Sequence, residues 1–378
     1  MKIKFILSHP VQYQTPFINF LTKNHLKVQV RYRSKVTNKK HFDPGFKRNI
    51  KWEFDLTKGH KYKYLNFIGP DISGKFLPLT TNFYQNIFDD DDDIILLHGN
   101  KNWYNILIIF LSKIFNKKVF LRDEPHHTST YRTPIGNIFN KMYYFIIDYF
   151  VSVFLSIGKA NKKYYLSNFI NKNKIINVPY SVDNNFFSIT KKKINKKKIF
   201  LTVAKFQHRK GYDILLNSIK TLNFKYKDEF YCEFWFVGDG ETKENSLNFV
   251  KTNKINNVKF FPFQNQKQLK KFYQKSDVFI LPSRLEPWGL VINEAMASSN
   301  AIICSDIVGS SFDLVKKGLN GFTFKTESYL DLAKKIEFFL NKKNISTYQK
   351  NSYKIISKWG FTEGLIGLKK AFKFIKNK

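Results

Sequence analysis

Cysteine and arginine are scarce in this sequence of 378 residues, although lysine is abundant. Cys232 and Cys304 are the only cysteines, and seven of the 64 basic residues are Arg. Two cysteines provide neither a disulfide framework nor a zinc-ligand set, which favours a reducing compartment. The scarcity of Arg argues against a dedicated nucleic-acid reader, because such proteins usually use the bidentate guanidinium fork.

The sequence also lacks an apolar run long enough to cross a membrane. The longest one, residues 142–157, is interrupted by Asp148 and falls short of about 20 residues. The N-terminal segment MKIKFILSHPVQYQ has neither a long apolar core nor a small-residue cleavage site. It is therefore typical of a first strand rather than of a signal peptide. Together these features predict a cytoplasmic protein.

Acidic residues are few, and the 29 of them leave a net charge of +35. A charge of this size is typical of a protein that meets a polyanion, such as nucleic acid, an anionic membrane face or a phosphorylated substrate. A second interpretation stays open. Lys, Asn, Ile and Phe are enriched together, as an AT-rich genome would enrich them without selection for binding.

Short apolar runs alternate with helical patterns, which predicts βαβ units and parallel sheets. The predicted fold class is α/β, with two Rossmann-like doubly wound domains facing a central cleft. Strands are predicted over residues 2–7, 28–32, 94–97, 119–121, 150–155, 199–203, 234–237, 258–261, 278–281 and 301–304. Helices are predicted over residues 103–115, 135–147, 212–219, 244–252, 266–274 and 289–297.

A lysine-rich segment with little apolar content separates the two halves. We predict an N-terminal domain on the acceptor side over residues 1–185 and a basic linker over residues 186–198. The C-terminal domain, on the donor side, is predicted over residues 199–360. Residues 361–378 are predicted to form a helical tail, with packing against the N-terminal domain as a hypothesis.

Two glutamates eight positions apart, Glu286 and Glu294, lie between a predicted strand and a predicted helix. Pro287 disfavours the helical region for Glu286, so this residue is expected on the loop. The first N–H groups of the helix lack intrahelical partners, and the helix dipole favours an anion there. These groups belong to Gly289, Leu290 and Val291. The pattern fits a nucleotide-diphosphate sugar, with the diphosphate at the helix start, the sugar near Glu286 and the ribose near Glu294.

This segment resembles the E-x7-E signature of the family 4 retaining glycosyltransferases, which have the GT-B fold of two Rossmann-like domains. The flanking sequence is similar as well, in GLVINEAMA from Gly289 and in VGDG from Val237. The segment VAKFQHRKG from Val203 resembles the phosphate-binding loop of that family. The resemblance implies that Lys205 and Lys210 bind the donor diphosphate.

The N-terminal half resembles a bacterial subset of the same family, with HPVQY from His9 and DPGF from Asp43. It lacks the glycine-rich loop that many members carry after the first strand. The sequence LRDEPH, which ends at His126, lies where family members have an active-site loop. The resemblance makes His126 and Glu286 candidates for catalysis. The candidates for the acceptor side or the cleft are His9, Gln12, Tyr13, Arg122 and Glu124.

The resemblance implies a metal-independent retaining glycosyltransferase that moves a sugar from a nucleotide-diphosphate donor to a saccharide or lipid-linked acceptor. Cell-surface polysaccharide or glycolipid synthesis is the expected setting, with no cofactor, no metal ion and no nucleic-acid partner. Residues 89–93, five consecutive Asp, are interpreted as a solvated turn. Two alternatives stay open: a nucleotide-sugar epimerase of the same fold and a basic nucleic-acid-binding protein. Lysines of the linker and of the N-terminal domain suggest a further hypothesis, peripheral contact with the anionic inner face of the cytoplasmic membrane.

Overall fold

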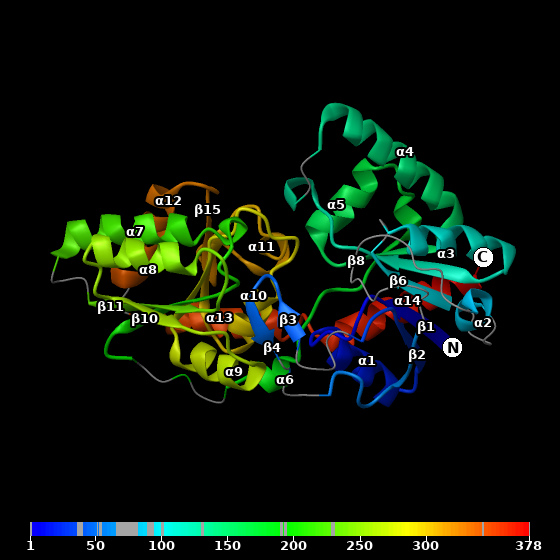
Figure 1. Cartoon of the computed structure of the whole chain (residues 1–378), viewed down its shortest axis with the longest axis horizontal. Coiled ribbons are helices and arrows are strands. Elements are labelled where there is room, and N and C mark those ends of the chain that lie inside the picture. The colour runs from blue at the N-terminus through cyan, green and yellow to red at the C-terminus, as the bar shows by residue number, and fades with distance from the viewer. Residues whose placement is uncertain are drawn as a thin grey trace. The chain divides into compact units, whose positions relative to one another are not determined.

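The structure is a computed structural model that describes residues 2–35, 41–50, 52, 55–65, 82–88, 94–99, 102–129, 132–189, 192, 195–227, 231–341 and 344–377. Contacts divide the chain into two units. Unit 1 comprises residues 1–41, 51–182 and 361–378, and unit 2 comprises residues 42–50 and 183–360. Each unit contains a parallel sheet with helices packed against it (Figure 1), as the alternating pattern predicts.

Unit 1 has the strand order β5-β2-β1-β6-β7-β8-β9. Its strands are β1 (Lys2–Leu7), β2 (Lys27–Tyr32), β5 (Lys61–Tyr64), β6 (Ile94–His98), β7 (Lys118–Arg122), β8 (Val153–Ser156) and β9 (Ile175–Asn177). Its helices are α1 (Gln14–Lys23), α2 (Phe83–Ile87), α3 (Trp103–Ile114), α4 (Pro134–Phe150), α5 (Lys159–Ser167) and α14 (Phe361–Lys376). The chain order reverses between β1 and β6, and such a point is where doubly wound sheets bind ligands.

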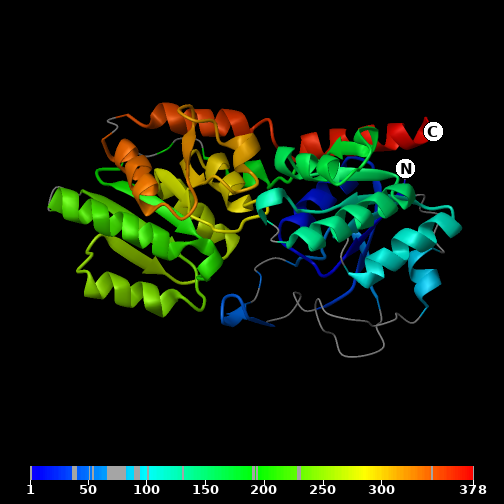
Figure 2. The ribbon, with the colours of Figure 1, turned by 90° about the horizontal axis from the view of Figure 1, so that it is seen from above.

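Helices cover both faces of the sheet in unit 1, which explains why its central strands, such as β6 and β8, are nearly continuous apolar runs. Helices α1 and α14 pack on one face, and α3, α4 and α5 pack on the other. Phe372 of α14 stacks on Phe120 of β7 with ring centroids 5.7 Å apart. The C-terminal helix, red in Figure 2, is therefore part of the core of unit 1.

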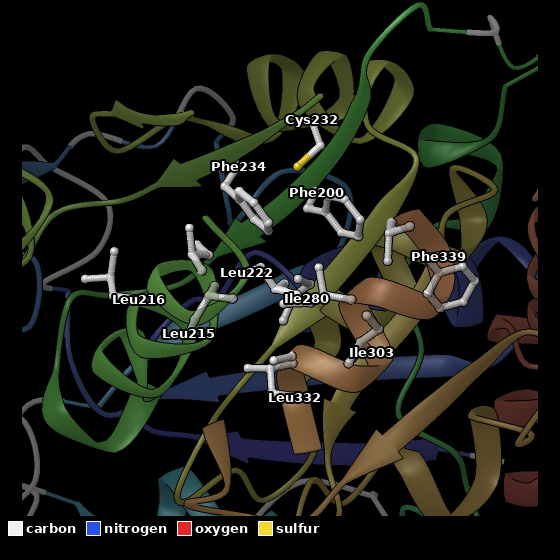
Figure 3. Close-up of a cluster of buried hydrophobic side chains, with 14 of the residues drawn as sticks. Phe200, Leu215, Leu216, Leu222, Cys232, Phe234, Ile280, Ile303, Leu332 and Phe339 are labelled. Atoms are coloured by element: carbon white, nitrogen blue, oxygen red, sulfur yellow. The ribbon is translucent and has the colours of Figure 1, made fainter. Parts of the chain in front are cut away.

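Unit 2 has the strand order β12-β11-β10-β13-β14-β15, which reverses between β10 and β13. Its strands are β10 (Lys198–Val203), β11 (Cys232–Val237), β12 (Val258–Phe261), β13 (Val278–Leu281), β14 (Ala301–Ser305) and β15 (Gly321–Phe324). Its helices are α6 (Asn184–Phe187), α7 (Tyr212–Tyr226), α8 (Lys243–Thr252), α9 (Gln266–Lys275), α10 (Leu290–Ala297), α11 (Ser311–Leu314), α12 (Tyr329–Asn341) and α13 (Ser346–Ile356). Figure 3 shows the core between sheet and helices, with Phe200, Phe234 and Ile280 facing Leu215, Leu222, Leu332 and Phe339.

Contacts divide the chain at different positions from those predicted. They assign residues 42–50 to unit 2, although these residues precede most of unit 1 in the sequence. This segment contains all of the short strand β4 (Arg48–Ile50) and all but the first residue of β3 (His41–Asp43), with which β4 pairs. They also assign residues 183–198, which include the predicted basic linker, to unit 2.

Lys192, in the predicted linker, is a structural residue of unit 2 rather than the surface charge that the composition suggests. Its Nζ donates to the carbonyl oxygens of Tyr273 at 2.8 Å and Ser298 at 2.9 Å. Burial lowers the pKa of Lys192, while the charge of Asp277 opposes that shift. This lysine is therefore excluded from the hypothesis of a membrane-binding linker.

The predicted strand over residues 150–155 starts too early. Helix α4 continues to Phe150, whose ring packs on Phe110 of α3 with centroids 4.5 Å apart, and β8 begins at Val153. The apolar run over residues 142–157 is thus the end of a helix followed by a strand. In the parts of the chain that the structure describes, no helix has the length and apolar character needed to span a bilayer.

Candidate functional site

The two lysines and the two glutamates singled out in unit 2 lie at the point where its strand order reverses. Strand β10 leads into the loop that carries Lys205 and Lys210, and β13 leads into the loop that carries Glu286. These strands pair with Phe200 opposite Val278. Both loops therefore leave the same edge of the sheet side by side, where ligands bind in doubly wound folds.

Lys210 and Glu286 form a buried ion pair across these two loops. The Nζ atom of Lys210 donates to Oε2 of Glu286, and each residue is only 9% exposed. Gly211 allows this approach, because it has φ +68° and a Cβ there would lie 2.0 Å from the carbonyl oxygen of Pro282. The Lys-Gly sequence thus places an ammonium group and a carboxylate together at the sheet edge.

Helix α10 begins beside the same pair. Gly289 precedes it with φ +89°, and a Cβ at this position would lie 3.2 Å from Cγ of Glu286. The first N–H groups of the helix, at Leu290 and Val291, have no intrahelical acceptors, and the N-terminus carries a partial positive charge. The helix start and the ammonium group of Lys210 are both positive groups suited to an anion.

Glu294 lies one turn into α10 and is 6% exposed. The hydroxyl of Tyr273, on α9, donates to its Oε2 at 2.8 Å. Burial raises the pKa of Glu294 to about 7, although this hydrogen bond lowers it. Tyr273 was not singled out from the sequence, because nothing in the pattern of α9 indicates which helix it faces.

Lys205 is paired with Asp43 of the segment that joins unit 2 from early in the chain. Its Nζ donates to the two carboxylate oxygens of Asp43 at 2.8 and 3.0 Å and lies 4.4 Å from the ring centroid of Phe46. Burial raises the pKa of Asp43, but the hydrogen bonds from Lys205 and from the N–H of Phe46 leave it below its usual value. The DPGF sequence therefore supplies a carboxylate to the cation that was predicted to bind phosphate.

Two further contacts hold residues 42–50 against unit 2. Arg48 donates from Nη1 to Oδ2 of Asp239 at 2.5 Å, in the VGDG turn after β11. Phe46 meets Phe263 with ring centroids 4.7 Å apart. The DPGF sequence resembles a family motif, but its contact with Lys205 is not predicted from the sequence, because residues 43 and 205 lie far apart along the chain.

Unit 1 brings together several of its candidates at the carboxyl ends of β6 and β7. The hydroxyl of Tyr180 donates to Oε1 of Glu124 at 2.6 Å and lies 2.9 Å from Nε2 of His98. Arg122 lies 4.4 Å from the ring centroid of Tyr180, and the ring of Tyr13 lies 5.9 Å from it. Burial opposes ionisation of Glu124, but the hydrogen bond and charge of His98 leave its pKa below the usual value. Tyr180 contacts every other member of this cluster, but it was not predicted to be part of the site.

Other candidates of unit 1 have different surroundings. His9 is half-buried, with Nδ1 3.0 Å from the Ser8 hydroxyl, and burial lowers its pKa. Gln12 has a buried Oε1 without a hydrogen-bond partner among the described residues. His126 is buried after β7, with Nδ1 3.0 Å from the Thr128 hydroxyl.

No group of three or more His, Cys, Asp or Glu side chains is arranged to hold a metal ion among the residues that the structure describes. The run of Asp at residues 89–93 lies outside those residues. The candidate residues of unit 2 bring ammonium groups, carboxyl groups and the start of α10 to the loops that follow β10 and β13.

The protein-family model described as glycosyl transferases group 1 matches residues 184–355. An uncharacterized glycosyltransferase of Methanocaldococcus jannaschii is 28% identical over 173 residues, which cover 46% of this chain and 47% of that protein. GalNAc-α-(1→4)-GalNAc-α-(1→3)-diNAcBac-PP-undecaprenol α-1,4-N-acetyl-D-galactosaminyltransferase of Campylobacter jejuni is 26% identical over 192 residues, 50% of this chain and 51% of that protein. The chain thus matches about half the length of these relatives.

Solved structures share the fold over the whole chain. A glycosyltransferase from Rickettsia africae has a TM-score of 0.74 and 16% identity, covering 100% of this chain and 99% of that one. HepE of Anabaena, in complex with UDP, has a TM-score of 0.73 and 15% identity, covering 99% and 100%. The two parallel sheets of this chain are thus those of a GT-B fold.

Proposed function

We propose that this chain, which matches the glycosyl transferase group 1 model over residues 184–355, is a glycosyltransferase with a nucleotide-sugar donor. The observation that carries the proposal is the meeting of Lys210, Glu286 and the start of α10 at the sheet edge where strand order reverses. A diphosphate at this edge would meet two ammonium groups and a helix N-terminus.

The proposed donor pose follows from the chemistry of each group. Lys205, Lys210 and the N–H groups of Leu290 and Val291 receive the diphosphate and stabilise it as the bond to the sugar breaks. Oε1 of Glu294 accepts from a ribose hydroxyl, since the bond from Tyr273 engages Oε2. The ammonium groups and the helix start thereby supply, from the chain itself, charge stabilisation of the leaving group.

Glu286 is proposed to accept hydrogen bonds from hydroxyls of the donor sugar. Its Oε2 is engaged by Lys210, and this ion pair lowers the electron density that a nucleophile would need. We therefore propose retention by a front-face route, in which the departing phosphate takes the proton of the acceptor hydroxyl. The proton, the leaving diphosphate and the new glycosidic bond are then on one face of the sugar.

The acceptor is proposed to be a saccharide or a lipid-linked saccharide. Support comes from the Campylobacter jejuni relative, whose name includes a polyprenyl diphosphate-linked saccharide acceptor. The direct test is to incubate the protein with a panel of nucleotide sugars, with and without lipid-linked saccharides, and to analyse both substrates by mass spectrometry. Acceptor mass increasing by one sugar supports the proposal. Conversion of the donor to its epimer without acceptor would contradict it.

Asp43→Asn is expected to tighten nucleoside diphosphate binding by about two- to fivefold. The Asp43 carboxylate competes with phosphate for Lys205, and a partly exposed ion pair of this kind contributes roughly 0.2–1 kcal/mol. Isothermal titration calorimetry measures the change. Glu337→Gln, which removes another ion pair of unit 2 at Lys225, is the matched control and should leave affinity unchanged. Weaker binding by the Asp43 variant would mean that residues 42–50 help to hold the donor.

His126→Gln is expected to lower the rate of sugar transfer by about tenfold or more, while the affinity for nucleoside diphosphate stays constant. This is the result expected for a general acid or base, or for a residue that positions the acceptor. His126 is buried in unit 1, whereas all the proposed donor contacts lie in unit 2. Steady-state transfer kinetics and calorimetry together measure the two quantities. His127→Gln is the control, since the neighbouring exposed imidazole lies 3.0 Å from the Ser167 hydroxyl. Equal rates for both variants would remove His126 from the site.

A further inference from the structure

Helix α4 of unit 1 carries apolar side chains on a face that its own unit does not bury. Buried residues of this helix are Tyr144 and Ile147. Six large apolar residues are more than half exposed, namely Ile135, Ile138, Phe139, Met142, Phe145 and Tyr149. At about 100° per residue these six fall within an arc of roughly 120°, on the side opposite Tyr144.

Neighbouring elements of unit 1 also expose large apolar residues. Ile114, at the end of α3, is 73% exposed, and Phe169, just after α5, is 62% exposed. Phe169 also has φ +65°, a left-handed backbone conformation that is rare for a bulky residue. Figure 1 shows α4 at the outer side of unit 1, next to α5. The α4 surface, defined as the stripe with Ile114 and Phe169, is therefore larger than a scatter of single apolar side chains.

Ammonium groups lie beside the aromatic members of this surface. Lys113 places Nζ 4.7 Å from the ring centroid of Tyr149, and Lys141 places Nζ 5.6 Å from that of Phe169. Lysines at the border of an apolar face keep their charge in water while their methylene stems cover apolar surface. Residues 102–177 contain eleven Lys and Arg against three acidic residues, so the charge around the α4 surface is strongly positive.

We propose that the α4 surface docks on an anionic lipid bilayer, with α4 lying in the interface. An apolar stripe bordered by lysines and aromatic rings is the pattern of helices that lie in the plane of the headgroups. The positive charge argues against a second copy of this chain as the occupant, because two such surfaces repel each other. The exposed Phe, Ile and Met side chains argue against nucleic acid, whose backbone offers no apolar partner. The proposal concerns unit 1 and holds whether or not the chain transfers sugars.

Flotation of the full chain with lipid vesicles tests this proposal. Vesicles of phosphatidylcholine alone are compared with an equimolar mixture of phosphatidylcholine and phosphatidylglycerol, each at low and high salt. The wild-type chain should float with the mixed vesicles at low salt. Phe139→Gln/Met142→Gln/Phe145→Gln should weaken this binding at least tenfold, because it removes the apolar contact. The matched control is Phe224→Gln on α7 of unit 2, where the side chain is 85% exposed, and it should bind as the wild type does.

A second variant separates the charge from the apolar contact. Lys113→Gln/Lys141→Gln should weaken binding to the mixed vesicles by about fivefold per lysine and reduce its salt dependence. Phe145→Gln alone, in a position too exposed to affect folding, should weaken binding several-fold if the triple variant fails to fold. The proposal is overturned if the wild-type chain does not float with mixed vesicles at low salt. It is equally overturned if the α4 variants float like the wild type, or if they change only self-association in sedimentation velocity.

Discussion

Lys210→Met is expected to lower the free energy of unfolding of unit 2 by about 3–5 kcal/mol. The substitution leaves the Glu286 carboxylate buried without its partner, and breaking a buried ion pair from one side has costs of this size. Urea unfolding followed by the circular dichroism of the full chain measures the loss. The matched control is Lys205→Met, whose ion pair with Asp43 is more exposed, and its effect should stay below about 1 kcal/mol.

The double variant Lys210→Met/Glu286→Gln distinguishes stability from binding. With both charges removed, most of the lost stability should return, since no uncompensated charge stays buried. Nucleoside diphosphate affinity should stay at least tenfold below that of the wild type, because a charge-assisted bond to phosphate has been removed. A double variant that regains stability and also binds nucleotide normally would show that Lys210 has a structural role only.

Glu294→Gln is expected to remove a pH dependence of stability that the wild type has. In the wild type, the buried carboxyl should lower the free energy of unfolding by up to about 3 kcal/mol between pH 4.5 and pH 7. The pKa of this carboxyl is about 7 in the folded protein, against 4.5 as its ordinary value, because it is buried. In this range the folded state keeps a proton that the unfolded state has released, so wild-type stability falls as pH rises. Below pH 4.5 both states are protonated, and above pH 7 both are ionised, so the contribution is constant outside the range.

The glutamine variant has no proton to exchange, and its amide oxygen still accepts from the Tyr273 hydroxyl. Its stability relative to the wild type should therefore increase from pH 5 to pH 8, as measured by urea unfolding at both values. Tyr273→Phe is the control variant, because it keeps the carboxyl buried and should retain the wild-type direction of the pH dependence. Parallel profiles for wild type and Glu294→Gln would mean that Glu294 is already ionised at low pH.

The sheet edges could be predicted from the sequence because they depend on local features. Apolar runs, Gly-containing turns and Pro287 mark where strands end and where α10 begins, within one or two residues. Since carboxyl ends of parallel strands meet at one edge, Lys210 and Glu286 could be expected near each other although they are 76 positions apart. Their direct ion pair needed the structure, since spacing does not specify the direction of a side chain.

Contacts that depend on chain trajectory could not be predicted in the same way. Nothing near Asp43 indicates that it reaches Lys205 of the second unit, and nothing near Lys192 indicates that a lysine-rich segment buries one of its ammonium groups. The exposed stripe of α4 was hidden for a different reason. Because apolar residues occur around most of the surface of α4, its sequence predicts a buried helix. Only the packing shows which face of the helix is exposed.

The central claim, that unit 2 holds a nucleoside diphosphate at the Lys210–Glu286 edge, is tested most directly by calorimetric titration of the full chain with UDP, GDP and ADP. At least one of them should bind at a single site and, at about 100 times its dissociation constant, stabilise the protein by roughly 2.7 kcal/mol. The Lys210→Met/Glu286→Gln variant should bind that nucleotide at least tenfold more weakly. A folded wild-type chain that binds none of the three, or a double variant that binds as tightly as the wild type, would contradict the account.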